Sequence, residues 1–479
     1  MIRVDIPPAA MDDAERFALG VLIDLSRLIP VDDPTADVVR LELVDSGAMS
    51  LRECVEGRWP LELSDGLVRM PRGTLRETAM ILLAKAEQEA SQRDRLGRIP
   101  SETNALVQGG FERDPVISRA GGALRGAAVA VAGRRIMRLV APWPESRRWA
   151  AAVTHDLDVV SMWPVFTLLR LAELSRKRRI SQVATVIAAA ARSIARDPVT
   201  AAVDDMLHHE REHGIRSTWF VLCGSPTLAT YRSGDLTYRS DSTALRRILD
   251  SLAEHGAEIG LHGSMETVDR DEAFAEQRTR LRQLTAMPVD GVRQHFLRMR
   301  PGTTYRGMTA AGFTYDSTVG FPDRNGFRLG VADVVPVWDG GQRVPGSLVE
   351  VPFCWMDRAL SKYRGVERPL DWVADAVALA RTCREVEGLW VGVWHPNLTP
   401  ALGYPGAPAA FVALLKALAA DDPWFATLED VVRWRATRRS FRIRAMTLDG
   451  RVARSGSSGA SPSTVALEDS SGRRVVDAP

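Results

Sequence analysis

Aspartate, histidine and arginine follow several apolar runs of this sequence, at points where a buried strand would end. They are Asp156 and Asp158 in "RWAAAVTHDLDVV", His262 in "AEIGLHG", Arg293 and His295 in "GVRQHFLR", and His395 in "LWVGVWHPN". One such histidine is more often a hydrogen-bonded core residue than a ligand. The whole chain has only 8 histidines, however, and charged groups buried without partners cost considerable free energy. The set therefore predicts a polar site built from several strand ends.

A divalent metal fits this combination of side chains. Carboxylate and imidazole groups are the ligands expected for Zn²⁺ or a related transition metal. A site with an open coordination position would leave room for water. We therefore expect a metal centre, with zinc as the first choice. His155 receives no role, because its side chain could point to either face of its strand.

Alternating elements must position these residues. From residue 148 onward, apolar strand-like runs alternate with helix-like segments about seven times. Such alternation predicts parallel strands joined by right-handed crossovers, with ligands at the carboxyl ends of the strands. The predicted fold class is α/β: a distorted (β/α)7-type barrel, with an N-terminal α/β domain and a short β-rich C-terminal tail.

The sequence pattern divides the chain into three regions. Residues 1–147 contain no histidine and no catalytic spacing, and we expect an α/β domain of unknown role there. Prolines and charged residues near 140–149 favour a domain boundary. The barrel would cover 148–438 with a helical insert at 161–200, followed by a β-rich or partly disordered tail at 439–479. The basic run in the insert, "LSRKRRISQ", is expected to be a solvated helix face.

Composition restricts the class of protein. The 479 residues are 45% hydrophobic and 25% charged with a net charge of +2, which is typical of a soluble globular protein and argues against a nucleic-acid binder. The four cysteines lie far apart, and no signal pattern or long apolar run is present. We expect a cytoplasmic protein without a transmembrane segment. The oligomeric state stays open.

The motifs resemble those of the polysaccharide deacetylase family, carbohydrate esterase family four. "THDLD" resembles the family's Asp-x-Asp motif, which implies that Asp156 is the catalytic base and Asp158 a metal ligand. "STWFVLCG", "AGFTYDSTVGF" and "PWFATLEDVVRWRATR" are similar to other family segments. His395 matches the last motif, where a histidine protonates the leaving amine. The resemblance covers about 148–438.

Two motifs depart from the family pattern. The family's second motif has two metal-binding histidines, whereas "HGSMETVD" supplies His262 and has Glu266 at the second position. In "RQHFLR", Arg293 matches the arginine that orients the base, and His295 replaces a proline. The resemblance therefore implies a metal bound by Asp158, His262 and either His295, which we favour, or Glu266.

The implied activity is metal-dependent hydrolysis of a carbon–nitrogen bond other than a peptide bond. The substrate would be a carbohydrate, an N-acetylated sugar or polysaccharide precursor that loses its acetyl group. Two alternatives stay open: a catalytically silent carbohydrate-binding protein on the same barrel, and a hydrolase of other non-peptide amides.

Overall fold

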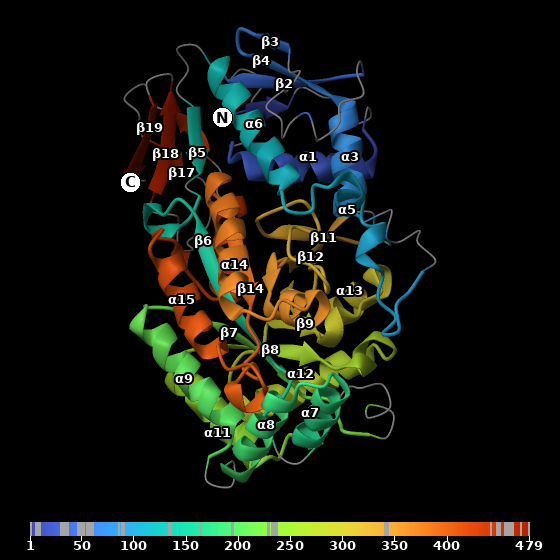
Figure 1. The fold of residues 1–479 in the computed structure, drawn as a ribbon. Helices are drawn as coiled ribbons and strands as arrows, with labels where there is room; N and C mark the ends of the chain where they lie inside the picture. The colour runs from blue at the N-terminus through green and yellow to red at the C-terminus, as the bar shows by residue number, and fades with distance from the viewer. Residues whose placement is uncertain are drawn as a thin grey trace.

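The fold is described from a computed structural model (Figure 1). The described residues are 2–4, 11–28, 38–45, 53, 62–84, 87, 92–132, 137–140, 142–162, 165–192, 196–227, 230, 238–339, 344–440, 443–446, 452–454, 464–469 and 472–477. All the residues expected to form the site are among them. Cys54 lies outside them.

A ten-stranded sheet forms the centre of the molecule, and β11 with β12 is its antiparallel pair. The strand order is β11-β12-β10-β9-β8-β7-β6-β14-β13, with β15 also beside β6. The bounds are β6 (Ala150–Leu157), β7 (Thr218–Leu222), β8 (Glu258–Gly263), β9 (Gly291–Gln294), β10 (Tyr315–Asp316), β11 (Val335–Asp339), β12 (Val344–Glu350), β13 (Trp355–Met356), β14 (Leu389–Val393) and β15 (Trp424–Phe425).

The short link between β12 and β13 shows that this sheet curls into a barrel. The two strands lie on opposite sides of the strand order, yet only residues 351–354 separate them. A stretch of this length spans at most about 18 Å. The N–H of Val351 donates to the carbonyl of Asp316 next to β12, and that of Cys354 donates to Val391 on β14. The two sides of the sheet must therefore approach each other.

Helices cover the outside of the sheet, as the sequence predicts for an α/β barrel. They are α7 (Val165–Arg176), α8 (Ile180–Arg192), α9 (Pro198–Glu212), α11 (Thr243–Glu254), α12 (Glu272–Thr285), α13 (Pro301–Ala310), α14 (Pro369–Glu385), α15 (Ala407–Ala419) and α16 (Leu428–Ser440). The apolar sequence of residues 347–355 favours one strand, but the structure divides this segment between β12 and β13. Pro352 lies in the break and has no backbone N–H for a strand ladder.

Side chains of β6 alternate between two environments. Ala150 and Ala152 point into the barrel, where they pack with Phe220 and Val391. Residues 151, 153 and 157 point outward into the layer between sheet and helices. Because this alternation continues to the end of the strand, neighbouring polar residues there face opposite sides of the sheet.

The N-terminal region forms a smaller sheet with order β1-β2-β4-β3. Its elements are β1 (Ile2–Val4), α1 (Asp13–Ser26), β2 (Val39–Val44), β3 (Glu62–Ser64), β4 (Leu67–Pro71), α3 (Arg72–Leu82), α5 (Ala105–Gly109) and α6 (Val116–Ala130). Its core continues into the barrel through Leu329 and Val331. Arg27, just after α1, forms a buried ion pair with Glu387, which also pairs with Arg125 of α6 at 2.9 Å.

The tail contains strands, as expected for 439–479. They are β16 (Ile443–Met446), β17 (Val452–Arg454), β18 (Thr464–Asp469) and β19 (Gly472–Asp477). Strand β18 also pairs with β5 (Met137–Val140), which brings the chain just before the barrel beside its end (Figure 1). The division at 147/148 stays a prediction. Because β5 pairs with β18, the first region and the tail share one sheet.

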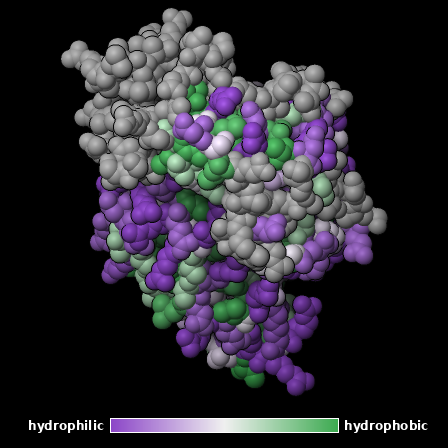
Figure 2. Space-filling view, turned by 90° about the horizontal axis from the view of Figure 1, so that it is seen from above, coloured by the Kyte–Doolittle hydropathy of each residue, from purple (hydrophilic) through white to green (hydrophobic). Residues whose placement is uncertain are grey.

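None of the helices within the described residues has the length and apolar character needed to cross a membrane. Seen from above, hydrophilic side chains lie among smaller hydrophobic groups on the coloured part of the surface (Figure 2). The expectation of a cytoplasmic location stays a prediction.

Candidate active site

Five of the residues singled out by the sequence line one cavity of about 370 Å³ at the carboxyl ends of the barrel strands. Asp156 and Asp158 come from the end of β6, His262 from β8, His295 from the turn after β9, and His395 from the turn after β14. Arg293 lies on β9, where it is buried and contacts Asp156.

Arg293 fixes the orientation of Asp156. Its Nη1 donates to Asp156 Oδ1 at 2.8 Å and to Thr154 Oγ1 at 2.9 Å, while Nε and Nη2 donate to the backbone and side-chain oxygens of Ser317, both at 2.9 Å. The guanidinium also lies over the Phe220 ring, 4.3 Å from its centroid. Because all these partners are fixed, the buried arginine leaves Asp156 Oδ2 facing the cavity.

Asp158, His262 and His295 approach one another as metal ligands would. Asp158 Oδ1 lies 3.3 Å from His262 Nε2 and 3.6 Å from His295 Nε2. Each residue offers one ligand atom, and the three atoms all lie within 4.8 Å of one another. A carboxylate with two imidazoles at this spacing is a ligand set for zinc with an open position.

The hydrogen bonding of His262 tests whether a metal fits this group. Its Nδ1 lies 2.8 Å from the carbonyl oxygen of Arg293, and a carbonyl only accepts, so Nδ1 carries the proton. In the neutral ring, Nε2 then directs a lone pair at the carboxylate of Asp158. Asp158 Oδ1 is itself buried without a hydrogen-bond partner among the described residues. A metal cation between these two atoms would satisfy both, and the carbonyl contact is the usual outer partner of a metal-binding histidine.

Asp357 orients His395. Its Oδ1 lies 2.6 Å from His395 Nδ1, and its Oδ2 accepts the backbone N–H of His395 at 2.6 Å. His395 Nε2 is left facing the cavity, 3.7 Å from Asp158 Oδ2 and 4.0 Å from Asp156 Oδ2. Burial alone would lower the pKa of His395, but the negative charges of Asp357 and Asp158 outweigh it and raise that pKa.

The pKa values of the two aspartates are shifted the other way. Burial by itself would raise the pKa of Asp156, but the charge of Arg293 holds it below its usual value. Burial likewise opposes the ionised form of Asp158, and its contacts with His262 and His295 outweigh this and lower its pKa. Both carboxyl groups are thus kept ionised, one beside an arginine and the other beside histidines.

Glu266 lies outside this group. Its carboxylate forms an ion pair with Arg270 at 3.2 Å, and its side chain is 35% exposed. It belongs to the short helical turn Met265–Val268 after β8. Among the described residues, the cluster with metal-ligand spacing in this cavity contains His295 and not Glu266.

A strained turn positions His295. Phe296 and Leu297 follow it with φ of 59° and 56°, in a region that costs an L-residue about 1–3 kcal/mol. The Phe296 ring stacks on the His295 ring with 3.9 Å between centroids. Arg98, from the N-terminal region, donates to the carbonyl of Phe296 at 3.3 Å. The first third of the chain therefore helps to form the site, which its sequence did not indicate.

His155 points away from the cavity. Its Nδ1 lies 2.8 Å from the carbonyl of Trp394 and its Nε2 2.6 Å from Glu210 on α9. The ring packs on Trp219 with 4.2 Å between centroids. Because both ring nitrogens are bonded in the outer layer, His155 is a structural residue.

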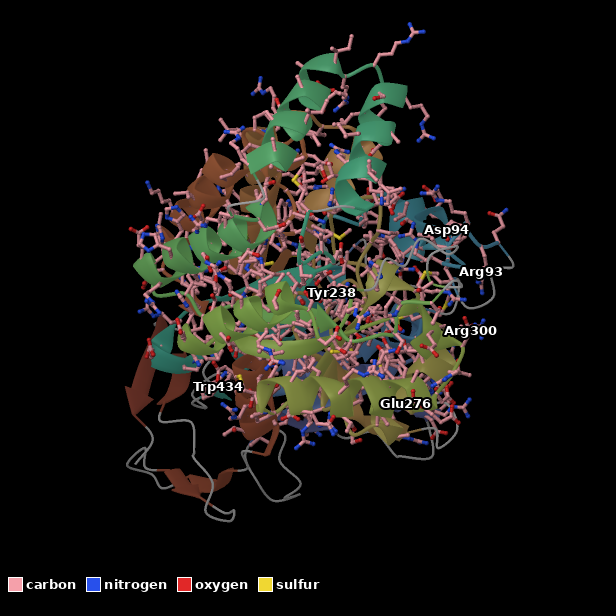
Figure 3. The ribbon with its side chains drawn as sticks, turned by 90° about the horizontal axis from the view of Figure 1, so that it is seen from below. Arg93, Asp94, Tyr238, Glu276, Arg300 and Trp434 are labelled. Atoms are coloured by element: carbon pink, nitrogen blue, oxygen red, sulfur yellow. The ribbon has the colours of Figure 1, made fainter. Side chains whose placement is uncertain are left out.

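Sequence reasoning missed Asp357 and Tyr238. Asp357 directly follows β13, so the same rule that selected the other strand ends could have found it. Tyr238, near the middle of the molecule in the view from below (Figure 3), accepts the N–H of Leu222 and donates to the carbonyl of Leu157, both at 2.9 Å. It joins the ends of β6 and β7 between the two aspartates, and no local pattern signals this.

Comparison with known proteins places the chain in no family. No family model matches it, and no curated protein matches it. Among solved structures, it is similar to a putative polysaccharide deacetylase from Mycobacterium smegmatis, at 22% identity and a TM-score of 0.42, covering 64% of this chain and 96% of that one. Peptidoglycan deacetylase PdaC from Bacillus subtilis aligns at 12% identity and a TM-score of 0.28, covering 61% and 93%.

A third similar structure is a pseudoenzyme of the CE4 family from Bacillus anthracis, at 8% identity and a TM-score of 0.26, covering 59% of this chain and 65% of that one. Identities and TM-scores of this size assign no activity. The function has to be inferred from the geometry of the cavity.

Proposed function

We propose that the protein is a metal-dependent hydrolase that removes an N-acetyl group from an N-acetylated sugar or polysaccharide precursor. The observation that carries this proposal is the convergence of Asp158, His262 and His295 on one point, with a fixed carboxylate and a fixed histidine beside it. These three residues would hold the ion, with zinc as the metal that fits the ligand set. When bound, such an ion polarises a carbonyl and lowers the pKa of water.

The pKa shifts of the two remaining groups favour the protonation states that amide hydrolysis needs. Asp156 is held ionised by Arg293, and its Oδ2 faces the cavity, so it would accept a proton from the attacking water. His395 has a raised pKa and presents Nε2 to the cavity, so it would donate a proton to the departing amine. Arg293 and Asp357 act as positioning residues, since each orients one of these groups.

The cavity supports a sugar as the substrate. Its volume of about 370 Å³ is in the range of small-molecule sites. Phe296, Tyr363 and Tyr404 line its walls, and aromatic rings beside polar groups suit the mixed apolar and hydroxyl faces of a sugar. Trp355 and Trp394, by contrast, pack in the outer hydrophobic layer.

The test is release of acetate from a panel of N-acetylglucosamine, its oligomers, nucleotide-linked N-acetyl sugars and small amides. We expect release from at least one N-acetylated sugar, loss after dialysis against a chelator, and recovery when Zn²⁺ is added. Lys416→Gln, which changes an exposed residue of α15 outside the cavity, is the matched control and should leave the rate unchanged.

Two outcomes would contradict the proposal in different ways. Sugar binding without acetate release, with or without metal, would indicate a silent carbohydrate-binding protein. Hydrolysis confined to small amides would indicate a different carbon–nitrogen hydrolase on the same barrel.

A further inference from the structure

The wall of the cavity carries more positive charge than the proposed chemistry uses. Six cationic side chains line it, against three carboxylates. The cations are Arg98, Arg170, Lys177, Arg179, Arg358 and Lys362, and the carboxylates are Asp156, Asp158 and Glu173. The basic run after α7, expected to be a solvated helix face, thus supplies Lys177 and Arg179 to the wall.

Most of these cations are neutralised locally. The pairs are Arg98 with Asp94 at 2.7 Å, Arg170 with Glu173 at 2.6 Å, Lys177 with Glu173 at 2.8 Å, and Arg179 with Glu367 at 2.6 Å. Arg358 and Lys362 differ, because neither has a carboxylate at ion-pair distance within the part of the chain that the structure describes.

Neutral groups hold Arg358 in place. Its Nη2 donates to Asn397 Oδ1 at 2.7 Å, and its Nη1 donates to Tyr404 Oη at 3.2 Å. These contacts fix the guanidinium and leave its charge in place. The charges of Asp357 and Asp158 both act on Arg358, which lines the same cavity as His395, so its guanidinium lies near the reacting end of the cavity.

Lys362 lies on the same wall, among other cations. Its Nζ is 5.6 Å from the centroid of the Tyr363 ring, and Arg98 lies at the same distance over that ring. Asp94, the partner of Arg98, comes from the N-terminal segment that lies at the side of the barrel (Figure 3). The positive charges of Arg358 and Arg98 act on Lys362, and Asp158 is the carboxylate that opposes them. Because a metal bound by Asp158 would take up that negative charge, the cations of this wall favour a further anion.

We propose that Arg358 and Lys362 form a subsite for an anionic group of the substrate, a phosphate or a carboxylate carried next to the N-acetylated sugar. This inference rests on the proposed function for the position of the sugar. An anion there would accept charge-assisted hydrogen bonds from both side chains. Arg358 is preorganised by Asn397 and Tyr404, which reduces the entropy lost on binding.

The experiment compares three ligands by calorimetry on the whole protein: N-acetylglucosamine, N-acetylglucosamine 1-phosphate and N-acetylmuramic acid. The first is neutral, the second carries a phosphate and the third a carboxylate. We expect at least one of the two charged sugars to bind about 10-fold more tightly than the neutral sugar, with the preference weakened by salt. The charged sugar that is preferred identifies the source of the anion.

The variants Lys362→Gln and Arg358→Gln should each reduce this preference about 10-fold, and with Lys362→Gln the neutral sugar should bind as before. Lys362 is exposed, so its replacement leaves the fold intact. Lys416→Gln, which removes an exposed lysine of α15 outside the cavity, is the matched control and should keep the preference.

Equal affinity of all three sugars for the wild-type protein, no binding of either charged sugar, or a preference that survives in both variants would each overturn the subsite. A charge preference without acetate release from any ligand would leave the subsite standing and remove the proposed hydrolase function instead.

Discussion

Two histidine–carboxylate pairs lie on opposite faces of the same sheet. His155 with Glu210 and His395 with Asp357 both have N···O distances of 2.6 Å, and both histidines are buried. The difference is the second ring nitrogen. In His155 it bonds to the carbonyl of Trp394, whereas in His395 it faces the carboxylates of the cavity. The same pair of residue types thus stabilises the packing of α9 in one case and presents a ring nitrogen to the cavity in the other.

The face of the sheet on which a histidine lies therefore determines whether its second ring nitrogen is bonded in the packing or faces the cavity. His155 and Asp156 are neighbours in sequence, yet alternation along β6 sends one into the helical layer and the other into the cavity. Substitutions on the inner face should therefore change activity and metal binding, whereas substitutions on the outer face should change stability.

The largest expected effect is that of Asp156→Asn on the inner face. Removing the proposed base should lower the rate of acetate release about 10²–10⁴-fold, because the amide accepts no proton at neutral pH. Bound metal should be retained, since Asp158, His262 and His295 are unchanged. Steady-state kinetics and metal analysis on the same sample check both points, and a rate close to that of the wild type would remove Asp156 from the mechanism.

Asp357→Asn should have the next largest effect, about 10–100-fold on the rate, as for other groups that orient a functional histidine. The pH profile gives a second readout. Burial lowers the pKa of His395, but Asp357 and then Asp158 outweigh it and raise that pKa. Activity that needs the protonated ring is present below this pKa and is lost as the pH rises through it. Without Asp357, the alkaline limb should move to lower pH; an unmoved limb would indicate that His395 is not the donor.

His155→Gln tests the outer face. Loss of the contacts to Glu210 and Trp394 should lower the free energy of unfolding by about 1–3 kcal/mol, because buried polar groups are left unpaired. The rate per folded molecule should stay near that of the wild type. Urea unfolding and active-site titration separate the two quantities. A large fall in turnover at unchanged stability would contradict the assignment of this pair to packing.

Glu266→Gln should have the smallest effect. Its carboxylate pairs with Arg270 and lies outside the ligand group, so stability should change by less than about 0.5 kcal/mol and metal affinity should not change. His295→Gln is the matched comparison, and it should weaken metal binding strongly. Metal titrations of both variants decide between them; the opposite order would make Glu266 the third ligand.

Strand-end residues made much of the barrel and its polar cavity predictable. The alternation of strands and helices gave the fold class, because parallel strands bring their carboxyl ends together. His262 and His395 each end an apolar run, and the whole set of such strand-end residues, not either histidine alone, indicated the site. The direction of His155 could not be predicted, because it depends on the register of β6 against β7 and on Glu210.

Contacts between distant segments account for the rest. Arg98 lies in a polar loop, and only the tertiary fold brings it to Phe296, far along the chain. The apolar pattern of residues 347–355 predicts one continuous strand. It does not show the break between β12 and β13, because the break depends on the closure of the barrel. Arg358 and Lys362 are distinguished from the cations around them because those cations are paired with carboxylates. No spacing in the sequence reveals this pairing.

The most direct test of the central claim is the metal content of the purified protein, measured by elemental analysis beside Asp158→Asn. The account predicts about one divalent metal ion per wild-type chain, with zinc preferred, and little or none in the variant. A wild-type protein without metal after incubation with Zn²⁺, or a variant that binds as much as the wild type, would contradict the assignment of Asp158, His262 and His295 as a metal site.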